Sequence, residues 1–196
     1  MGRATAELFA EEGAQVAVTD YVLAPAEALA AELRGRGLAA QAWKLDVSDP
    51  AEIAAAVAQI ADAFGGLAIV VNNAGIQHRE PLLDVSLEDW NRVINTNLTA
   101  AFVVGRTAAR RMIERGTGGK IINIGSLTSE AARATVAPYT VAKGGIKMLS
   151  KAMAAEWAMH GIQANSIGPG YILTDMYEAL VNNVAFDAWV KASNPT

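Results

Sequence analysis

Short runs of β-branched residues alternate with alanine-rich, helix-like stretches along the whole chain, and this alternation limits the fold more than any other feature. A strand followed by a helix, repeated several times, is typical of α/β proteins with parallel strands. We therefore predict a doubly wound parallel sheet with helices on both faces, with ligands bound beyond the carboxyl ends of its strands. Strands are expected at residues 14–20, 39–46, 67–72, 119–126 and 162–169, and helices at 2–12, 25–36, 50–64, 86–115 and 138–160.

Two of these helices begin with a capping pattern. Asp49 is followed three residues later by Glu52, and Ser86 is followed in the same way by Asp89. A side-chain oxygen at the first position accepts hydrogen bonds from free backbone N–H groups of the first turn. No repeat or low-complexity linker interrupts the alternation, so residues 1–196 are predicted to form one domain.

Composition excludes several classes of function. The net charge of −4 offers no basic surface for nucleic acid, and the absence of cysteine excludes disulfides, thiol catalysis and zinc–thiolate sites. The two histidines, His78 and His160, lack metal-ligand spacing, so no metal site is predicted. No apolar run reaches the roughly 18 residues of a membrane span, and the first residues do not resemble a secretory signal. We expect a cytoplasmic protein without nucleic-acid or membrane partners.

Ser126, Tyr139 and Lys143 form the most informative pattern for function. Tyr139 and Lys143 are four residues apart in a predicted helix and therefore share one face. An ammonium near a phenol favours the phenolate, so Lys143 is expected to lower the pKa of Tyr139 from about 10. Ser126, at a strand end, is placed to hold a substrate oxygen that exchanges a proton with Tyr139. A tyrosine and a lysine at this spacing also suit an ordinary helix surface, and the serine favours catalysis.

Further motifs accompany these residues in a fixed order. They are "NNAG" at 72–75, "NTNLTAAF" around Asn97 and "PGYILT" at 169–174. With the serine, tyrosine and lysine, this series resembles the short-chain dehydrogenases/reductases over essentially the whole chain. The resemblance implies a Rossmann-like fold, and hydride transfer between a nicotinamide cofactor and a secondary alcohol or ketone.

The resemblance also implies a role for each catalytic candidate. Tyr139 is the expected acid/base, and Ser126 is expected to orient the substrate oxygen. Lys143 is expected to hold the nicotinamide ribose as well as lower the tyrosine pKa. The backbone carbonyl of Asn97 is expected to hold a water that relays protons from the lysine; an ordinary polar helix residue is the alternative for Asn97.

Cofactor binding is expected to involve residues that match the family's motifs. A carboxylate at Asp20, at the end of a strand, can accept hydrogen bonds from the adenosine ribose and repel a 2′-phosphate. Tyr21 follows it where an arginine would neutralise that phosphate, so NAD is favoured over NADP. The expected cofactor-binding residues are Gly2, Asp20, Asp46, Val47, Asn72, Ala74, Gly75, Tyr139, Lys143, Pro169, Gly170, Ile172 and Thr174.

The substrate is expected to be a sugar acid. Residues 72–102 and 179–192 look most like the family members that act on gluconate, which implies interconversion of gluconate and 5-ketogluconate. Arg79 and Arg133 would suit a sugar-acid carboxylate, although exposed arginines are also common on ordinary surfaces. Reduction of a 3-oxoacyl thioester and oxidation of another polyol or sugar are the alternatives within the family. A homo-oligomer, tetramer or dimer, is implied for the full-length protein.

The two ends of the sequence depart from the family pattern. Gly2 matches the last glycine of a T-G-x-x-x-G-x-G turn, whose preceding strand and other glycines are absent. That strand would lie between the strands ending at Asp20 and Asn72, and a final strand is also missing. We therefore expect a truncated chain, and a non-catalytic fragment is the alternative to a working enzyme. Residues 171–196 are expected to form a helical lid.

Overall fold

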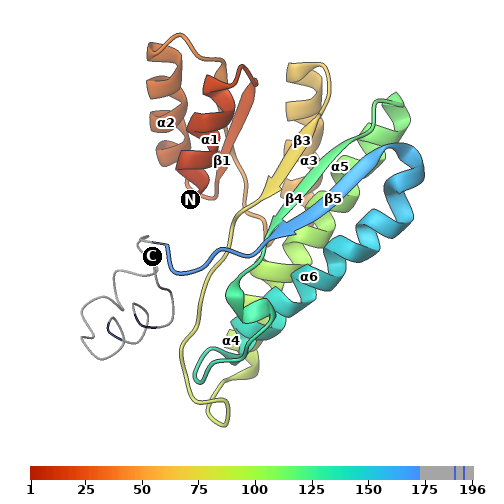
Figure 1. Cartoon of the computed structure of the whole chain (residues 1–196). Coiled ribbons are helices and arrows are strands. Elements are labelled where there is room, and N and C mark those ends of the chain that lie inside the picture. Colours follow the sequence, from red (N-terminus) through yellow and green to blue (C-terminus); the bar gives the residue numbers. More distant parts are fainter. Residues whose placement is uncertain (173–187, 189–191, 193–196) are drawn as a thin grey trace.

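The computed structural model describes residues 1–172, 188 and 192. Within them the chain forms an α/β fold of parallel strands and surrounding helices (Figure 1). The strands are β1 (Val16–Asp20), β2 (Ala40–Lys44), β3 (Ile69–Asn72), β4 (Gly119–Ile124) and β5 (Ile162–Ile167). The helices are α1 (Gly2–Glu11), α2 (Leu23–Gly35), α3 (Pro50–Phe64), α4 (Leu87–Ile94), α5 (Ala100–Arg115) and α6 (Ala137–Trp157). Every helix and strand predicted before residue 170 is present, with ends shifted by a few residues.

The strands form two hydrogen-bonded groups. β1 and β2 pair in parallel, and β3, β4 and β5 pair in parallel in that order. Among the described residues β1 pairs only with β2 and β3 only with β4, which agrees with the expectation that the strands ending at Asp20 and Asn72 are not neighbours. Figure 1 shows the two groups side by side, with β1 and β3 facing each other.

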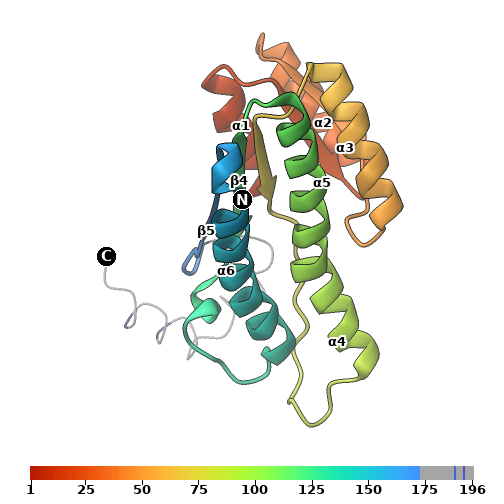
Figure 2. The same cartoon turned by 90° about the vertical axis from the view of Figure 1, so that its right-hand side faces the viewer.

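Three apolar clusters hold the helices on the strands. Helices α1 and α2 bury Ala10, Leu29 and Leu33 against β1 and β2. Helices α5 and α6 lie along β3, β4 and β5, as Figure 2 shows, and enclose Met112 and Ile121. The third cluster joins α3 to α5. Burial of this apolar surface is the main force that holds the layers together.

The helix predicted over 86–115 runs in one direction, but its backbone hydrogen-bond pattern changes partway along it. Asn95–Thr99 forms a π-helical turn between α4 and α5. Such turns are rare and occur frequently at functional sites. Helix periodicity alone could not predict it, because a π turn adds one residue without ending the apolar pattern.

The two predicted caps are present, but their partners differ from the simple pattern. The Asp49 side chain accepts hydrogen bonds from the N–H groups of Ala51 and Glu52. The Glu52 carboxylate does not return to Asp49; it accepts from the N–H of Asp46 at 2.9 Å and from Lys44 at 3.0 Å. The cap therefore also ties the end of β2 to α3.

Candidate active site

The predicted site residues gather at one end of the strands. Asp20 ends β1, Asn72 ends β3, Ser126 follows β4, and Pro169 and Gly170 follow β5. The carboxyl ends of parallel strands meet at the same edge of a sheet, which is where α/β proteins bind their ligands. The expectation from the strand pattern therefore agrees with this arrangement.

Tyr139 and Lys143 lie on one face of α6, beside Ser126. The Nζ atom of Lys143 is 5.5 Å from the centroid of the Tyr139 ring. The side chain of Ser126 lies close enough to the phenol of Tyr139 to lower its pKa, which opposes the effect of burial. The three predicted catalytic side chains are thus close together, in an arrangement that can hold a substrate oxygen between a serine and a tyrosine hydroxyl.

Ser129, which the sequence analysis did not select, fixes Ser126 relative to Lys143. Its hydroxyl accepts a hydrogen bond from the N–H of Ser126 at 3.3 Å and donates one to the backbone carbonyl of Lys143 at 2.9 Å. Residues 127–129 form a 3₁₀ turn that begins with Ser126 as its cap. The S-x-x-S spacing was the available signal, because it is a variant of the capping box.

Lys143 is buried, with 4% of its surface exposed. Its ammonium donates a hydrogen bond to the carbonyl of Ile124, the last residue of β4, at 2.6 Å. Burial disfavours the charged form and lowers the pKa of Lys143 to about 8. One hydrogen bond leaves two further N–H groups of the ammonium to donate to a ligand.

The pKa of Tyr139 is raised in this structure and not lowered as the spacing predicted. Burial raises the pKa of Tyr139 above 10, and the two groups that oppose this effect are the Ser126 side chain and the charge of Arg79. Lys143 instead directs its ammonium to the carbonyl of Ile124. The spacing correctly placed the lysine near the ring, but it could not predict which atom the ammonium would contact.

Asn97 lies in the π-helical turn and is 2% exposed. Its side-chain amide donates to the carbonyl of Ile76 at 2.7 Å and its oxygen accepts from the N–H of Ile76 at 2.8 Å. A Cβ added at Gly75 would lie 3.2 Å from the same oxygen. Asn97 therefore holds the loop after β3 by a two-point contact, and Gly75 permits the close approach.

Asn72 is directed toward the interior and away from a ligand. Its amide donates to the side-chain oxygen of Asn123 at 2.8 Å, and Asn123 in turn donates to the hydroxyl of Ser150 at 2.8 Å. Asn123 and Ser150 are both buried. This chain of polar groups joins β3, β4 and α6, and the sequence analysis did not identify its last two members.

The remaining predicted cofactor residues lie around the same edge. The Asp46 carboxylate accepts from the N–H and hydroxyl of Ser48, and these bonds hold the pKa of Asp46 below its usual range. Val47 packs against the cluster between α3 and α5. A Cβ added at Gly2 would lie 2.7 Å from the amide nitrogen of Asn73, so α1 begins close to the loop after β3.

Asp20 and the last predicted residues complete the set. The Asp20 carboxylate accepts a hydrogen bond from the N–H of Val22 at 3.0 Å. Ala74 and Ile172 are exposed. Thr174 lies outside the described residues, as does most of the predicted lid over 171–196; Tyr171 and Ile172 are its first two residues and are described.

Arg79 and Arg133 lie on two loops, and Arg79 is close enough for its charge to act on both Arg133 and Tyr139. Burial lowers the pKa of Arg79, and the charge of Arg133 lowers it further, whereas Tyr139 and Tyr171 raise it. Two guanidinium groups that repel each other next to a phenol make an environment that favours an anion. The structure therefore places Arg79 within electrostatic range of both Arg133 and the predicted acid/base Tyr139.

The described residues present no helix that is long and apolar enough to cross a membrane.

A family model, a curated relative and two solved structures all relate this chain to the same group of proteins. The family model for short chain dehydrogenases matches residues 1–185. The 5-keto-D-gluconate 5-reductase of Escherichia coli K12 is 43% identical over 183 residues, covering 93% of this chain and 72% of the relative. A candidate gluconate dehydrogenase from Agrobacterium tumefaciens has a solved structure with 57% identity and a TM-score of 0.94, covering 98% of this chain and 76% of that one. A gluconate 5-dehydrogenase from Burkholderia cenocepacia J2315, solved with NADP and tartrate, has 43% identity and a TM-score of 0.93, covering 97% of this chain and 74% of that one.

Proposed function

Because the chain belongs to the short-chain dehydrogenase family and is therefore an NAD(P)-dependent oxidoreductase, we propose that it interconverts gluconate and 5-ketogluconate. The observation that carries the sugar-acid assignment is the position of Arg79, whose charge is close enough to act on Tyr139. A guanidinium at that position can bind the carboxylate of a substrate whose reacting hydroxyl lies at the phenol. The relatives that act on gluconate support the same substrate.

The residues of the site suit a nicotinamide dinucleotide. The Lys143 ammonium makes one hydrogen bond to the protein and can donate further ones to the ribose hydroxyls. Gly75 lies close to Asn97 and has no side chain, so the loop after β3 leaves room for the cofactor at this point. We assign the cofactor to Gly2, Asp20, Asp46, Val47, Ala74, Gly75, Lys143, Pro169, Gly170, Ile172 and Thr174. When bound, the cofactor supplies or accepts the hydride at its nicotinamide ring.

The protein's own residues move the proton and hold the substrate. In the reductive direction the Tyr139 hydroxyl donates its proton to the ketone oxygen, which the Ser126 hydroxyl also contacts. In the oxidative direction the tyrosine oxygen accepts the proton of the secondary alcohol. Burial keeps the phenol protonated, whereas Ser126 and Arg79 stabilise the phenolate. Burial is the larger effect, so the phenol is held in the form that donates a proton to a ketone.

Lys143 and Asn97 support this transfer. Lys143, with its pKa lowered to about 8, can exchange a proton near neutral pH. A water on the backbone carbonyl of Asn97 would connect it to solvent, and the π-helical turn is the local distortion that this role requires. Arg79, with Arg133 beside it, holds the carboxylate at the other end of the substrate.

NAD is the proposed preferred cofactor. Asp20 places a carboxylate at the end of β1, where it repels a 2′-phosphate, and the neighbouring Tyr21 is 70% exposed and carries no positive charge. The Burkholderia cenocepacia relative was solved with NADP, so the two cofactors must be compared directly. A kcat/KM that is higher with NADP than with NAD would reject this assignment.

Three expectations remain predictions: the protein forms a homo-oligomer (tetramer or dimer), residues 1–196 form a single domain, and the protein is cytoplasmic. Phe102 on α5 and Val141 and Met148 on α6 are exposed apolar side chains that a subunit contact would cover. Light scattering during size-exclusion chromatography tests the assembly. A monomeric full-length protein would contradict it.

A substrate panel tests the proposed function. The full-length enzyme is assayed by nicotinamide absorbance with gluconate, 5-ketogluconate, a neutral polyol and a 3-oxoacyl thioester. We expect the highest kcat/KM for the gluconate and 5-ketogluconate pair, and a loss of at least about tenfold when Arg79 is replaced by alanine. Turnover of the thioester without turnover of 5-ketogluconate would overturn the assignment.

A further inference from the structure

The loop that carries Arg79 is fixed on both sides of that residue. Before it, Ile76 is held by Asn97 through two hydrogen bonds. After it, the N–H of Glu80 donates to the carbonyl of Thr135 at 2.9 Å. Thr135 has a φ of 67°, a left-handed conformation that a β-branched residue rarely adopts, so this contact is maintained despite local strain. The loops of Arg79 and Arg133 are thus joined through their backbones.

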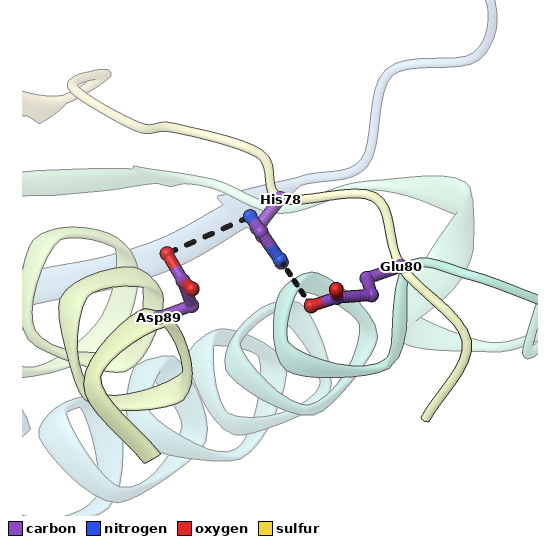
Figure 3. Close-up of side chains that lie close together, drawn as sticks. All are labelled: His78, Glu80 and Asp89. Atoms are coloured by element: carbon purple, nitrogen blue, oxygen red, sulfur yellow. Dashed lines mark hydrogen bonds and ion pairs between the residues drawn. The ribbon is translucent and has the colours of Figure 1, made fainter. Parts of the chain in front are cut away.

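His78, the residue before Arg79, lies between two carboxylates from different elements (Figure 3). Its Nε2 atom is 2.9 Å from Oε2 of Glu80, and its Nδ1 atom is 3.7 Å from Oδ1 of Asp89. The His78 side chain is 23% exposed, and neither carboxylate is fully buried. One ring nitrogen is therefore within hydrogen-bond distance of Glu80, and the other faces Asp89 at a longer distance.

Asp89 gives this arrangement a fixed anchor on α4. Its carboxylate accepts a hydrogen bond from the Ser86 hydroxyl at 2.8 Å and one from Arg92 at 2.6 Å. These bonds, with the charge of His78, hold the pKa of Asp89 below its usual range, so the carboxylate remains an anion. The ring of His78 is consequently tied to a helix and not to a mobile side chain.

A metal ion is the other ligand that a histidine and two carboxylates suggest. The geometry disfavours it, because Glu80 faces one ring nitrogen of His78 and Asp89 faces the other. An ion bound to either nitrogen would have one carboxylate beside it and the second across the ring. Asp89 is also committed to Ser86 and Arg92.

We propose that His78, clamped between Glu80 and Asp89, is a positioning residue that fixes Arg79 for the carboxylate of the substrate. The proposal rests on the assignment of Arg79 as the carboxylate-binding residue. On one side of Arg79, His78 connects the loop to Asp89 on α4. On the other side, the backbone N–H of Glu80 connects the same loop to the carbonyl of Thr135. Holding the backbone of Arg79 in place before binding reduces the entropy lost when the anion binds. His78 itself needs no contact with substrate or cofactor.

The test is a double-mutant cycle on the full-length enzyme, with 5-ketogluconate as the variable substrate. His78→Gln keeps a polar side chain that can reach only one of the two carboxylates. We expect its KM for 5-ketogluconate to rise about tenfold, with kcat and the cofactor KM changed by less than about twofold. In an Arg79→Ala background the same substitution is expected to have no further effect on KM, because the residue through which it acts is gone.

Two further variants separate the clamp from general stability. Asp89→Asn weakens the clamp from the helix side and is expected to raise KM in the same direction. Glu88→Ala removes an exposed carboxylate of the same helix that takes no part in the clamp, and it is expected to leave KM unchanged. Thermal unfolding of each variant shows whether it is folded under assay conditions; a His78→Gln protein that does not fold is replaced by Asp89→Asn in the cycle.

Three outcomes would overturn the proposal. An unchanged KM in both His78→Gln and Asp89→Asn would remove the positioning role, as would an equal rise in KM with and without Arg79. A rise in KM caused by EDTA alone would identify the cluster as a metal site instead. An unmodified enzyme that does not turn over 5-ketogluconate would refute the proposed function itself, which is a distinct result.

Discussion

Replacing the buried Lys143 with methionine should stabilise the protein at neutral pH while it impairs catalysis. Methionine has nearly the same length and packs well in an apolar environment. The lysine is 4% exposed, and burial lowers its pKa to about 8. Below pH 8 the Lys143 ammonium is charged in the folded protein although it is buried. The same charge costs less free energy in the unfolded chain, where the ammonium is in water.

The size of the effect follows from this pKa. The difference from the ordinary value of 10.5 corresponds to about 3 kcal/mol, at roughly 1.4 kcal/mol for each pKa unit. Methionine leaves the Ile124 carbonyl without the donor that contacts it at 2.6 Å, which costs about 1 kcal/mol. We expect a net gain of about 2 kcal/mol in the free energy of unfolding at pH 7.

The sign of the pH dependence provides the sharper test. Between about pH 8 and pH 10.5 the unfolded chain keeps its lysine proton while the folded protein loses it, so the unmodified protein becomes more stable as pH rises. The gain from Lys143→Met is therefore complete below pH 8 and close to zero at pH 10. Urea denaturation at pH 7 and pH 10 measures it, with Lys151→Met on the exposed side of α6 as the matched control. A destabilised Lys143→Met protein at pH 7, or a gain that does not fall with pH, would refute the reasoning.

Three further predictions concern substitutions in the full-length enzyme. Tyr139→Phe should lower kcat by at least about 100-fold while calorimetry finds the cofactor Kd nearly unchanged, and more than about a tenth of the original rate would contradict its role. Replacing Asp20 with serine and Tyr21 with arginine should raise the kcat/KM ratio of NADP to NAD, because a negative charge is removed and a guanidinium added. Asn97→Ala should lower the free energy of unfolding by about 2–4 kcal/mol in urea denaturation, since it leaves both partly buried backbone groups of Ile76 without their side-chain partner. A loss below about 1 kcal/mol would show that water replaces the asparagine.

The order of the elements could be predicted because each depends on local pattern. The apolar runs that end at Asp20 and Asn72 identified strands, and Asp49 and Ser86 marked the starts of helices that the structure contains. Parallel pairing and the position of the site at the strand ends then followed from general rules for α/β proteins. The π-helical turn at Asn95–Thr99 did not follow, because it depends on the two-point contact with the loop after β3.

Side-chain direction was the part of the site that sequence spacing could not supply. Asn72 lies at the expected strand end, yet its amide turns inward to Asn123 and not toward the ligand edge. His78 offers no metal-ligand spacing along the chain, and its two partners are contributed by a loop and by α4. In both cases the deciding contact joins elements that the sequence alone does not place at hydrogen-bond distance.

The electrostatics of Tyr139 illustrate the same limit and connect acid/base chemistry to substrate charge. Spacing on α6 predicted a cation beside the phenol, and the structure adds a second one, Arg79, whose charge lowers the pKa of Tyr139 from a loop sixty residues earlier. Arg79 is also the residue proposed to bind the carboxylate. An anion paired with that guanidinium would weaken its effect on the phenol and so favour the protonated tyrosine, which is the form that donates a proton to a ketone. Gluconate and 5-ketogluconate carry the same carboxylate, so either would weaken the influence of Arg79 on Tyr139, a coupling that a neutral polyol could not produce.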